Sequence, residues 1–255
     1  MMSYTPKKYR ILGTLFLVVL MAFCSCGYSI AADTTELGGR DSILLSWDMW
    51  RMILGGFKTT ITIFFFAAIE SLLLSSLLTY LGISGKCQWF YKPIYWFTRT
   101  IRDVPAVALM MLFYYVIFGG NLNGIIVTII ASGLYTSGAI VGIFQRNIEK
   151  VGSGQIEAGR ALGMTTRQCY KYIVFPQAAK SMAPELTLQI KAQLRITSYA
   201  GYISQTDLIR SVFYVEDIYS NMLIPLLIAS SLYLIMAKSI ERAIKFYSVK
   251  LFKYD

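Results

Sequence analysis

Few residues of this chain could carry acid–base or nucleophilic chemistry. The 255 residues contain no histidine, which excludes His-based triads, His general acids and most transition-metal sites. Pairs such as Lys191 with Ser198 lack a credible base and occur freely in polar helices. The stretch GISGK at 82–86 lacks the spacing of a phosphate-binding loop. We therefore expect no enzyme, no metal site and no ATPase site in this chain.

Charged side chains do interrupt the apolar segments, at Glu70, Lys191 and Arg195. A charge near the centre of a bilayer costs about 2.5 to 3.5 kcal/mol on insertion scales, so it is seldom tolerated without a role. In a structural interpretation, Glu70 pairs with Lys191 or Arg195, or Arg195 lies near the cytoplasmic helix end and reaches water. In a functional one, the three charges line a pathway, together with Thr197 and Ser198 as hydrogen-bond donors.

The composition indicates that these charges lie in a polytopic membrane protein. Hydrophobic residues make up 56% of the chain and the mean hydropathy is +0.54, both too high for a typical soluble domain. The net charge of +10 does not require nucleic acid, because membrane proteins concentrate Lys and Arg in cytoplasmic loops. Four cysteines form no disulfide framework.

Hydrophobic runs and polar loops alternate along the chain, and the basic residues fall in alternate loops. The apolar run at 11–26, with its basic start, predicts a signal peptide or a signal-anchor helix. Later spans are expected at about 53–81, 104–118, 123–144, 186–196 and 222–237, with loops between them. The stretch LTLQIKAQLRI at 186–196 alternates like a strand, but a lone strand in a bilayer leaves its backbone unpaired, so we expect a helix.

The charge distribution orients these spans. Loops at 1–10, 82–105, 145–182 and 237–255 hold 18 of the 24 Lys and Arg residues, whereas the opposite loops hold three. The positive-inside rule therefore places both termini and the loop at 145–182 in the cytoplasm. The acidic loop with Asp207, Glu216 and Asp217 is expected outside. We expect an all-α fold, with residues 1–52 as an N-terminal segment and 53–255 as the transmembrane domain.

A polar, basic stretch at 155–178, QIEAGRALGMTTRQCYKYIVFPQA, separates two of the long apolar runs. One short helix is expected to end at Gly163, and a second to begin at Thr165 or Thr166, which can cap it. Pro176 is expected to close the second helix. Two short helices joined near a glycine form a projection that can insert into a groove on another protein.

The spacing E-A-G-x-x-x-G-x9-I-x-F-P in this stretch resembles the signature cytoplasmic loop, E-A-A-x-x-x-G-x9-I-x-L-P, of the membrane subunits of bacterial ABC importers. Further segments are similar to permeases of the polar amino acid uptake branch: RDVP at 102–105, GQIEA at 154–158, FPQA at 175–178 and RITS at 195–198. The chain departs from the branch pattern at Asp103, Gly142, Gln145, Leu188 and Arg195-Ile196.

The resemblance implies five core transmembrane helices and a coupling loop at about 147–178 that docks into an ABC ATPase. It implies that ATP and Mg are bound by that partner chain, with no cofactor in this one. Other implied partners are an extracytoplasmic solute-binding protein, a second permease subunit, an amino acid substrate and the lipid bilayer of the inner membrane. The residues implied in coupling are Glu157, Ala158, Gly159, Gly163, Ile173 and Pro176. The intramembrane charges would meet the carboxylate and amino groups of a passing amino acid.

Two alternatives remain open from the residues. One is an ABC permease for another small solute. The other is a channel or secondary carrier that works without an ATPase, and the signature loop is the feature that discriminates against it.

Overall fold

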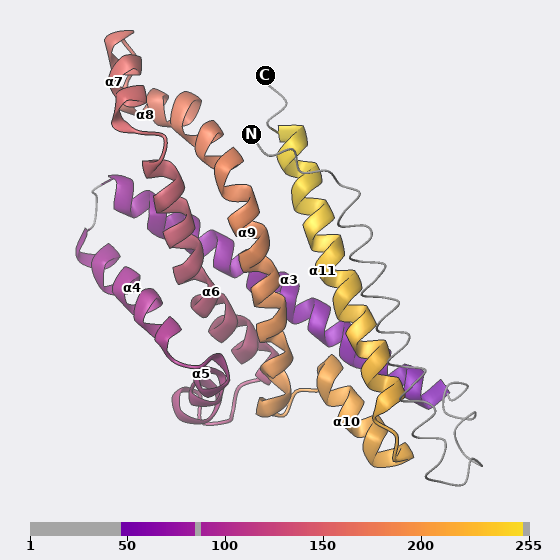
Figure 1. Cartoon of the computed structure of the whole chain (residues 1–255). Coiled ribbons are helices and arrows are strands. Elements are labelled where there is room, and N and C mark those ends of the chain that lie inside the picture. Colours follow the sequence, from indigo (N-terminus) through magenta and orange to yellow (C-terminus); the bar gives the residue numbers. More distant parts are fainter. Residues whose placement is uncertain (1–46, 85–87, 252–255) are drawn as a thin grey trace. The chain divides into compact units, whose positions relative to one another are not determined.

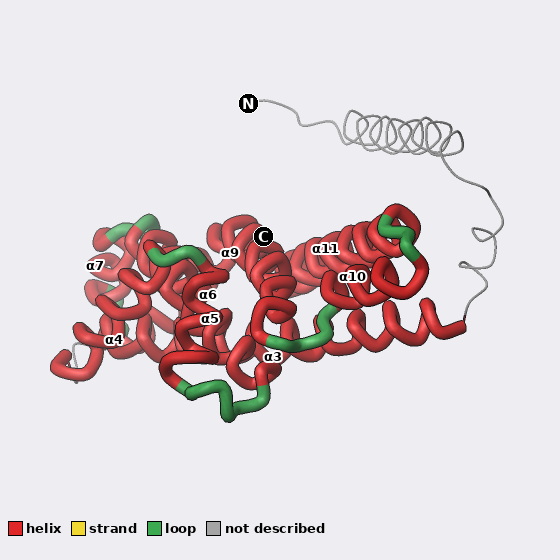
Figure 2. Tube along the Cα trace, turned by 90° about the horizontal axis from the view of Figure 1, so that it is seen from below, coloured by secondary structure: helices red, strands yellow, loops and turns green. Residues whose placement is uncertain are grey.

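The computed structural model describes residues 47–84 and 88–251, and every regular element in these ranges is a helix (Figures 1 and 2). The expected all-α fold is confirmed there, whereas the apolar run at 11–26 lies outside the described residues. The helices described belong to one compact unit, Asp48–Asp255. The long ones are α3 (Trp47–Ser84), α6 (Gly124–Glu149), α9 (Phe175–Thr197) and α11 (Leu223–Leu251).

Three of these helices are long and apolar enough to cross a membrane: α3, α6 and the part of α11 at Leu223–Phe246. A shorter apolar helix covers Ala106–Ile117, where α5 (Ala106–Met111) continues into the π-helical η2 (Leu112–Ile117). Helix α9 has 23 residues but is more polar, since it carries Lys180, Glu185, Lys191 and Arg195. These apolar helices support a membrane protein, while the number of crossings, five in the core, stays a prediction.

Two stretches that we expected to be loops are helical. Helix α4 (Gln88–Thr100) lies within the stretch 82–105. Helix α10 (Leu208–Tyr219) lies within the acidic stretch. It is capped by Asp207, whose carboxylate accepts a hydrogen bond from the Arg210 N–H at 2.9 Å. The expected helix at 186–196 is confirmed as part of α9. The sequence did not identify α4 and α10 as helices, because the apolar faces of both are too short to be recognised as membrane spans.

Helix α6 is the element against which the neighbouring helices pack, and its buried side is built from small residues. A Cβ added at Gly138 would overlap the Thr98 carbonyl of α4, and one added at Gly133 would overlap the Glu70 carboxylate of α3. Small residues at this segment therefore let the helices approach closely. The amide of Gln145 also links α4 to α6, because it donates to the Tyr91 hydroxyl at 2.9 Å.

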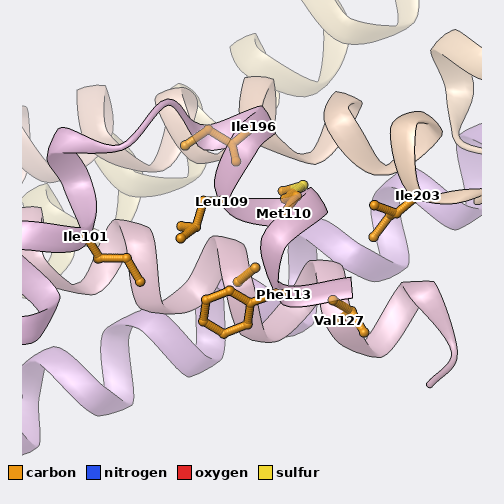
Figure 3. Packing of buried hydrophobic residues seen from close by; sticks show 8 residues of the cluster. Ile101, Leu109, Met110, Phe113, Val127, Ile196 and Ile203 are labelled. Atoms are coloured by element: carbon orange, nitrogen blue, oxygen red, sulfur yellow. The ribbon is translucent and has the colours of Figure 1, made fainter. Parts of the chain in front are cut away.

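Larger side chains form the main hydrophobic core at one end of α6 (Figure 3). Phe113 of η2 and Val127 of α6 lie in it, together with Ile203 of the 3-10 turn η4 (Ser198–Ile203) that follows α9. This core holds the short apolar helix against α6 and the end of α9. It is completed by Ile101, Leu109, Met110, Ala131 and Ile196.

A second buried contact joins the start of α10 to α3. The Leu208 N–H donates to the Thr60 hydroxyl at 3.0 Å, and Gly56 lies so close that an added Cβ would be 2.5 Å from the Asp207 carbonyl oxygen. The side chain of Asp207 is fully buried. Burial raises the pKa of this carboxyl from its ordinary 3.8 to about 6.

This raised pKa predicts a pH dependence of stability. The folded state holds the Asp207 proton more tightly than the unfolded chain, so the contribution to stability is fully present below about pH 3.8 and is lost as the pH rises through about 6. Asn caps helices as well as Asp does. We therefore expect Asp207→Asn to unfold at a higher temperature than the parent at about pH 7.5, with a much smaller gain at about pH 4.5.

Thermal unfolding of the purified protein at both pH values measures this difference. Asp207→Ala is the control: it also removes the titrating carboxyl, so it should show the same change between the two pH values as Asp207→Asn, but should be less stable than Asp207→Asn by about 1 kcal/mol at either pH because the cap is lost. A gain in Asp207→Asn that is the same at both pH values would contradict the assignment.

Candidate functional site

The signature stretch folds as a hairpin of two short helices between the end of α6 and the start of α9 (Figure 1). Its first helix, α7 (Ser153–Ala161), ends in a Schellman motif, in which the Gly163 N–H donates to the Arg160 carbonyl at 3.0 Å and the Met164 N–H to the Gly159 carbonyl at 3.1 Å. Gly163 has a φ of +84°, and a Cβ there would meet nothing within 4 Å. The expected helix end is confirmed, and glycine is required for its backbone conformation rather than for space.

The second helix, α8 (Thr166–Cys169), begins as expected. The side chain of Thr165 accepts from the Gln168 N–H at 3.3 Å, and the Gln168 side chain accepts from the Thr165 N–H at 2.8 Å, which makes a complete capping box.

The prediction that Pro176 closes this helix is wrong. The chain continues from α8 through the π-helical η3 (Tyr170–Val174) into α9, and Pro176 is the second residue of α9. The π turn explains the difference: the Phe175 N–H bonds to the Tyr170 carbonyl five residues earlier, and Pro176 then occupies a first-turn position where a missing N–H is tolerated.

The two arms of the hairpin pack through Gly159, Cys169 and Ile173. A Cβ at Gly159 would lie 2.8 Å from the Cys169 Sγ and 2.9 Å from the Ile173 Cδ1. Cys169 is fully buried there, and its thiol points to the Ile156 carbonyl at 3.8 Å. Glycine in place of the second alanine of the pattern is therefore matched to the cysteine on the opposite arm.

Other residues of the stretch face outward. Glu157 and Ala158 are exposed, and Leu162 at the hairpin tip is 84% exposed. The sequence groups Ala158, Ala161 and Leu162 on one side of the helix, and all three are exposed, whereas Gly159 is the buried residue of α7. The residues implied in coupling thus fall into two groups: some shape the hairpin, and others form its exposed surface.

An ionic network, which the sequence analysis did not find, ties together the two helices that hold the hairpin. The Glu185 carboxylate of α9 accepts from Arg146 at 2.9 Å and from the Asn147 amide at 3.1 Å, and Lys150 lies 3.5 Å away. Ser181 donates to the other side of the Asn147 amide at 2.8 Å. A carboxylate directly after Pro184, opposite the basic end of another helix, is the signal that could have indicated this network.

The three intramembrane charges are not brought together. Lys191 pairs with Glu241 of α11 at 3.1 Å, so the expected pairing of Lys191 with Glu70 is wrong. Glu70 lies against Gly133, and its Oε2 is buried without a hydrogen-bond partner. Arg195 is exposed, which argues against a pair with Glu70. It lies in the last turn of α9, at the end away from the hairpin, so the expected place near the cytoplasmic helix end does not fit either.

A buried polar layer lies beside Glu70 between α3, α6 and α9. Ser71 donates to the Gln193 side-chain carbonyl at 3.2 Å, and Ser75 to the Ser137 backbone carbonyl at 3.0 Å. Thr197 is also fully buried, whereas Ser198 is half-buried. The arrangement binds three helices through neutral hydrogen bonds, so no ion pair with Glu70 is needed for their packing.

The contact of Gly159 with Cys169 predicts a pairwise effect. Gly159→Ala should lower the free energy of unfolding by about 1 to 3 kcal/mol, because its Cβ overlaps the Cys169 Sγ. Cys169→Ala in the same chain removes the overlapping sulfur and should restore part of that loss. Thermal unfolding of the two single variants and the double variant measures the coupling. Strictly additive effects would show that the two positions do not interact.

Glu70→Gln should not destabilise the fold, in contrast to Gly159→Ala. The glutamine amide has the same size, and neutralising an unpaired carboxylate removes the cost of burying a charge, so the variant should unfold at or above the parent temperature. Lys191→Gln is the comparison: it breaks the pair with Glu241 and should unfold lower by about 1 kcal/mol or less. Loss of assembly or folding in Glu70→Gln would mean that the carboxylate has a structural partner.

Known proteins share this architecture and sequence pattern. The family described as "Binding-protein-dependent transport system inner membrane component" matches residues 71–245. The probable glutamine ABC transporter permease protein GlnM of Bacillus subtilis (strain 168) is 27% identical over 173 residues, which cover 66% of this chain and 78% of GlnM. The arginine transport system permease protein ArtQ of the same strain is 25% identical over 207 residues, covering 76% and 92%.

Solved structures share the fold. A chain from a crystal structure of an amino acid ABC transporter with histidines superposes with a TM-score of 0.71 at 21% identity, covering 82% of this chain and 98% of that one. A chain of the inward-facing MetNI methionine ABC transporter gives 0.63 at 17% identity, covering 81% and 99%. Because the family match spans most of the described helices and includes the hairpin, the chain belongs to the family of inner-membrane components of binding-protein-dependent transport systems.

Proposed function

We propose that this chain is the permease subunit of an ATP-driven ABC importer that moves a polar amino acid into the cytoplasm. The observation that carries the proposal is the α7–α8 hairpin, a rigid projection with an exposed tip, joined without a break to α9 and by a short turn to α6. The names of the relatives support the solute class, since GlnM and ArtQ are permeases for glutamine and arginine.

In this proposal the hairpin docks into an ABC ATPase, which binds the ATP and Mg. Leu162 at the tip enters a groove on the ATPase, and Glu157 and Ala158 line the contact, because Glu157 and Ala158 are exposed on α7 and Leu162 is exposed directly after it. Gly159, Gly163 and Ile173 act by shaping the hairpin. Closure of the ATPases on ATP then moves the hairpin as one body.

The hydrogen bonds and ion pairs of Glu185 couple the movement of the hairpin to the helices of the membrane domain. They join the end of α6 to α9 immediately below the hairpin, through both Arg146 and Asn147. A push on the hairpin must therefore move the two helices together. The polar layer between α3, α6 and α9 transmits the movement to α3.

For the solute, Arg195 is the residue of the intramembrane set best placed to meet a carboxylate. It is exposed, whereas Lys191 is already paired with Glu241 and Glu70 faces α6. Ser198 lies on the same helix face and can add a hydrogen bond. A solute-binding protein delivers the amino acid from outside, and a second permease subunit, identical or related, completes the pathway.

A permease for another solute of similar size is the competing candidate, and an ATP-independent channel is disfavoured because it would have no use for the hairpin. The ligand of the solute-binding protein that co-purifies with this chain decides between the solutes. Recovery of an amino acid supports the proposal, and recovery of a sugar, metal or anion would replace the solute class.

Leu162→Asp tests the coupling role. A charged side chain at the tip cannot be buried in a groove, so we expect loss of ATPase association and of solute-stimulated ATP hydrolysis by at least about tenfold in the reconstituted complex, with an unchanged unfolding temperature of the permease. Ser153→Asp is the matched control: it adds the same charge to the first turn of α7, where an acidic residue is favourable, and should leave coupling intact. Full ATPase association of Leu162→Asp would remove the tip from the interface.

A further inference from the structure

Two charged residues lie at a break between α4 and α5. The helix is interrupted there by the 3-10 turn η1 (Ile101–Asp103) and by the extended backbone of Val104. Ile101 is buried in the main hydrophobic core (Figure 3), whereas Arg102 and Asp103 are exposed. The break therefore presents one positive and one negative side chain on the surface of the domain.

Contacts with α6 indicate the depth of this break. The Tyr135 hydroxyl donates to the Arg102 carbonyl at 3.5 Å, and a Cβ added at Gly138 would lie 3.2 Å from the Arg102 Cδ. The apolar part of α6, at 125–144, is about 30 Å long at 1.5 Å per residue, which matches the hydrocarbon core of a bilayer. Tyr135 lies at the middle of that part. The break is therefore near the centre of the bilayer, deeper than the cytoplasmic loop expected at 82–105.

Neither charge at the break is neutralised within residues 47–84 and 88–251, since no ion pair there includes Arg102 or Asp103. Ionised side chains at this depth do not face lipid; they face a water-filled cavity or another protein group. Irregular backbone at membrane depth is under the same restriction. The outer side of the break therefore borders the solute pathway or a second subunit.

The end of α9 lies around the same core and brings another exposed charge. Ile196 packs in the main hydrophobic core together with Ile101, and these two residues directly follow Arg195 and precede Arg102 in the chain. The proposed function assigns the carboxylate of the solute to Arg195. An amino acid also carries an ammonium group, which requires a negative partner, and Asp103 supplies that charge at the break.

We propose that Asp103 binds the ammonium group of the transported amino acid near the middle of the membrane. The inference rests on the proposed function of the chain as an amino acid permease. A carboxylate with no competing ion pair can replace part of the hydration that the ammonium loses, through a charge-assisted hydrogen bond. A second subunit packed on the break would instead have to bury both charges away from water, at a large desolvation cost. Asp103 is also a position at which the chain departs from the branch pattern, so this contact would be particular to this chain.

Binding to the purified permease–ATPase complex, without the solute-binding protein, tests this role. The probe is whichever of the twenty radiolabelled amino acids the complete reconstituted importer takes up fastest. A hydrogen bond to a charged group changes affinity about ten- to a hundredfold, so Asp103→Asn should weaken binding by that factor. Asp103→Glu keeps the charge and should recover most of the affinity. The same amino acid without its amino group should bind the parent and Asp103→Asn within about twofold of each other, because it cannot make the contact.

Asp217→Asn is the matched control. It removes the same charge from an exposed position of α10 and should change binding less than twofold. An unchanged unfolding temperature and unchanged ATPase association show that the variants are folded, and Asp103→Glu with the deaminated probe carries the test if Asp103→Asn is not.

The inference is overturned if the parent complex does not bind the probe, if Asp103→Asn binds it as the parent does, or if the deaminated probe is weakened equally. It is also overturned if Arg102→Asp with Asp103→Arg restores an assembly that each single change disrupts, which would assign the two charges to a contact between subunits. An importer that takes up none of the twenty amino acids would refute the proposed function itself, and this contact with it. Uptake by the parent with unaltered binding in Asp103→Asn refutes the contact alone.

Discussion

Close approach of small residues on α6 is the constraint on which the rest of this domain depends. In a bilayer, apolar side chains gain little by leaving lipid for protein, so helices associate where their backbones can come near and their polar groups can pair. Gly138 lets the Thr98 carbonyl of α4 reach α6, and the Ser137 carbonyl accepts a bond from Ser75 of α3. Larger residues at these positions would separate the helices and leave the polar layer unpaired.

The same helix ends in the hairpin, so packing and coupling cannot be separated. Helix α6 enters the signature stretch and α9 leaves it, and Glu185 joins the two helices at that level. The hairpin is therefore fixed to the most tightly packed pair of the domain rather than to a peripheral helix. Residues that look structural, such as Gly159 and Asn147, determine the position of the docking surface through this connection.

Local chemistry made part of this arrangement predictable. The helix end at Gly163 and the cap at Thr165 follow from residue types that act within a few positions. The alternating stretch at 186–196 was assigned to a helix because a bilayer leaves a lone strand unpaired, and that physical argument held against the pattern. The helices α4 and α10 were missed because, at 13 and 12 residues, they are too short to cross a bilayer and were assigned to the loops between spans.

Partners distant in the chain could not be predicted. Lys191 is 50 residues from Glu241, and nothing in either segment indicates the pair. Glu70 was chosen because it is the acidic residue inside an expected apolar span. The match between Gly159 and Cys169 likewise needs the fold of the hairpin. The prediction that Pro176 ends the helix was wrong because proline interrupts α-helical hydrogen bonding, whereas the preceding turn is π-helical.

That π turn sets the azimuth of the hairpin about the axis of α9. Each residue of an α-helix rotates the chain by about 100°, so a turn that accommodates one extra residue shifts every earlier side chain by that angle relative to an unbroken helix. A homologue with the same number of residues but an α-helical turn at Tyr170–Val174 would have its docking tip on a different side of the helix axis. Compatibility between a permease and its ATPase then depends on the phase of this helix as well as on the residues at the contact.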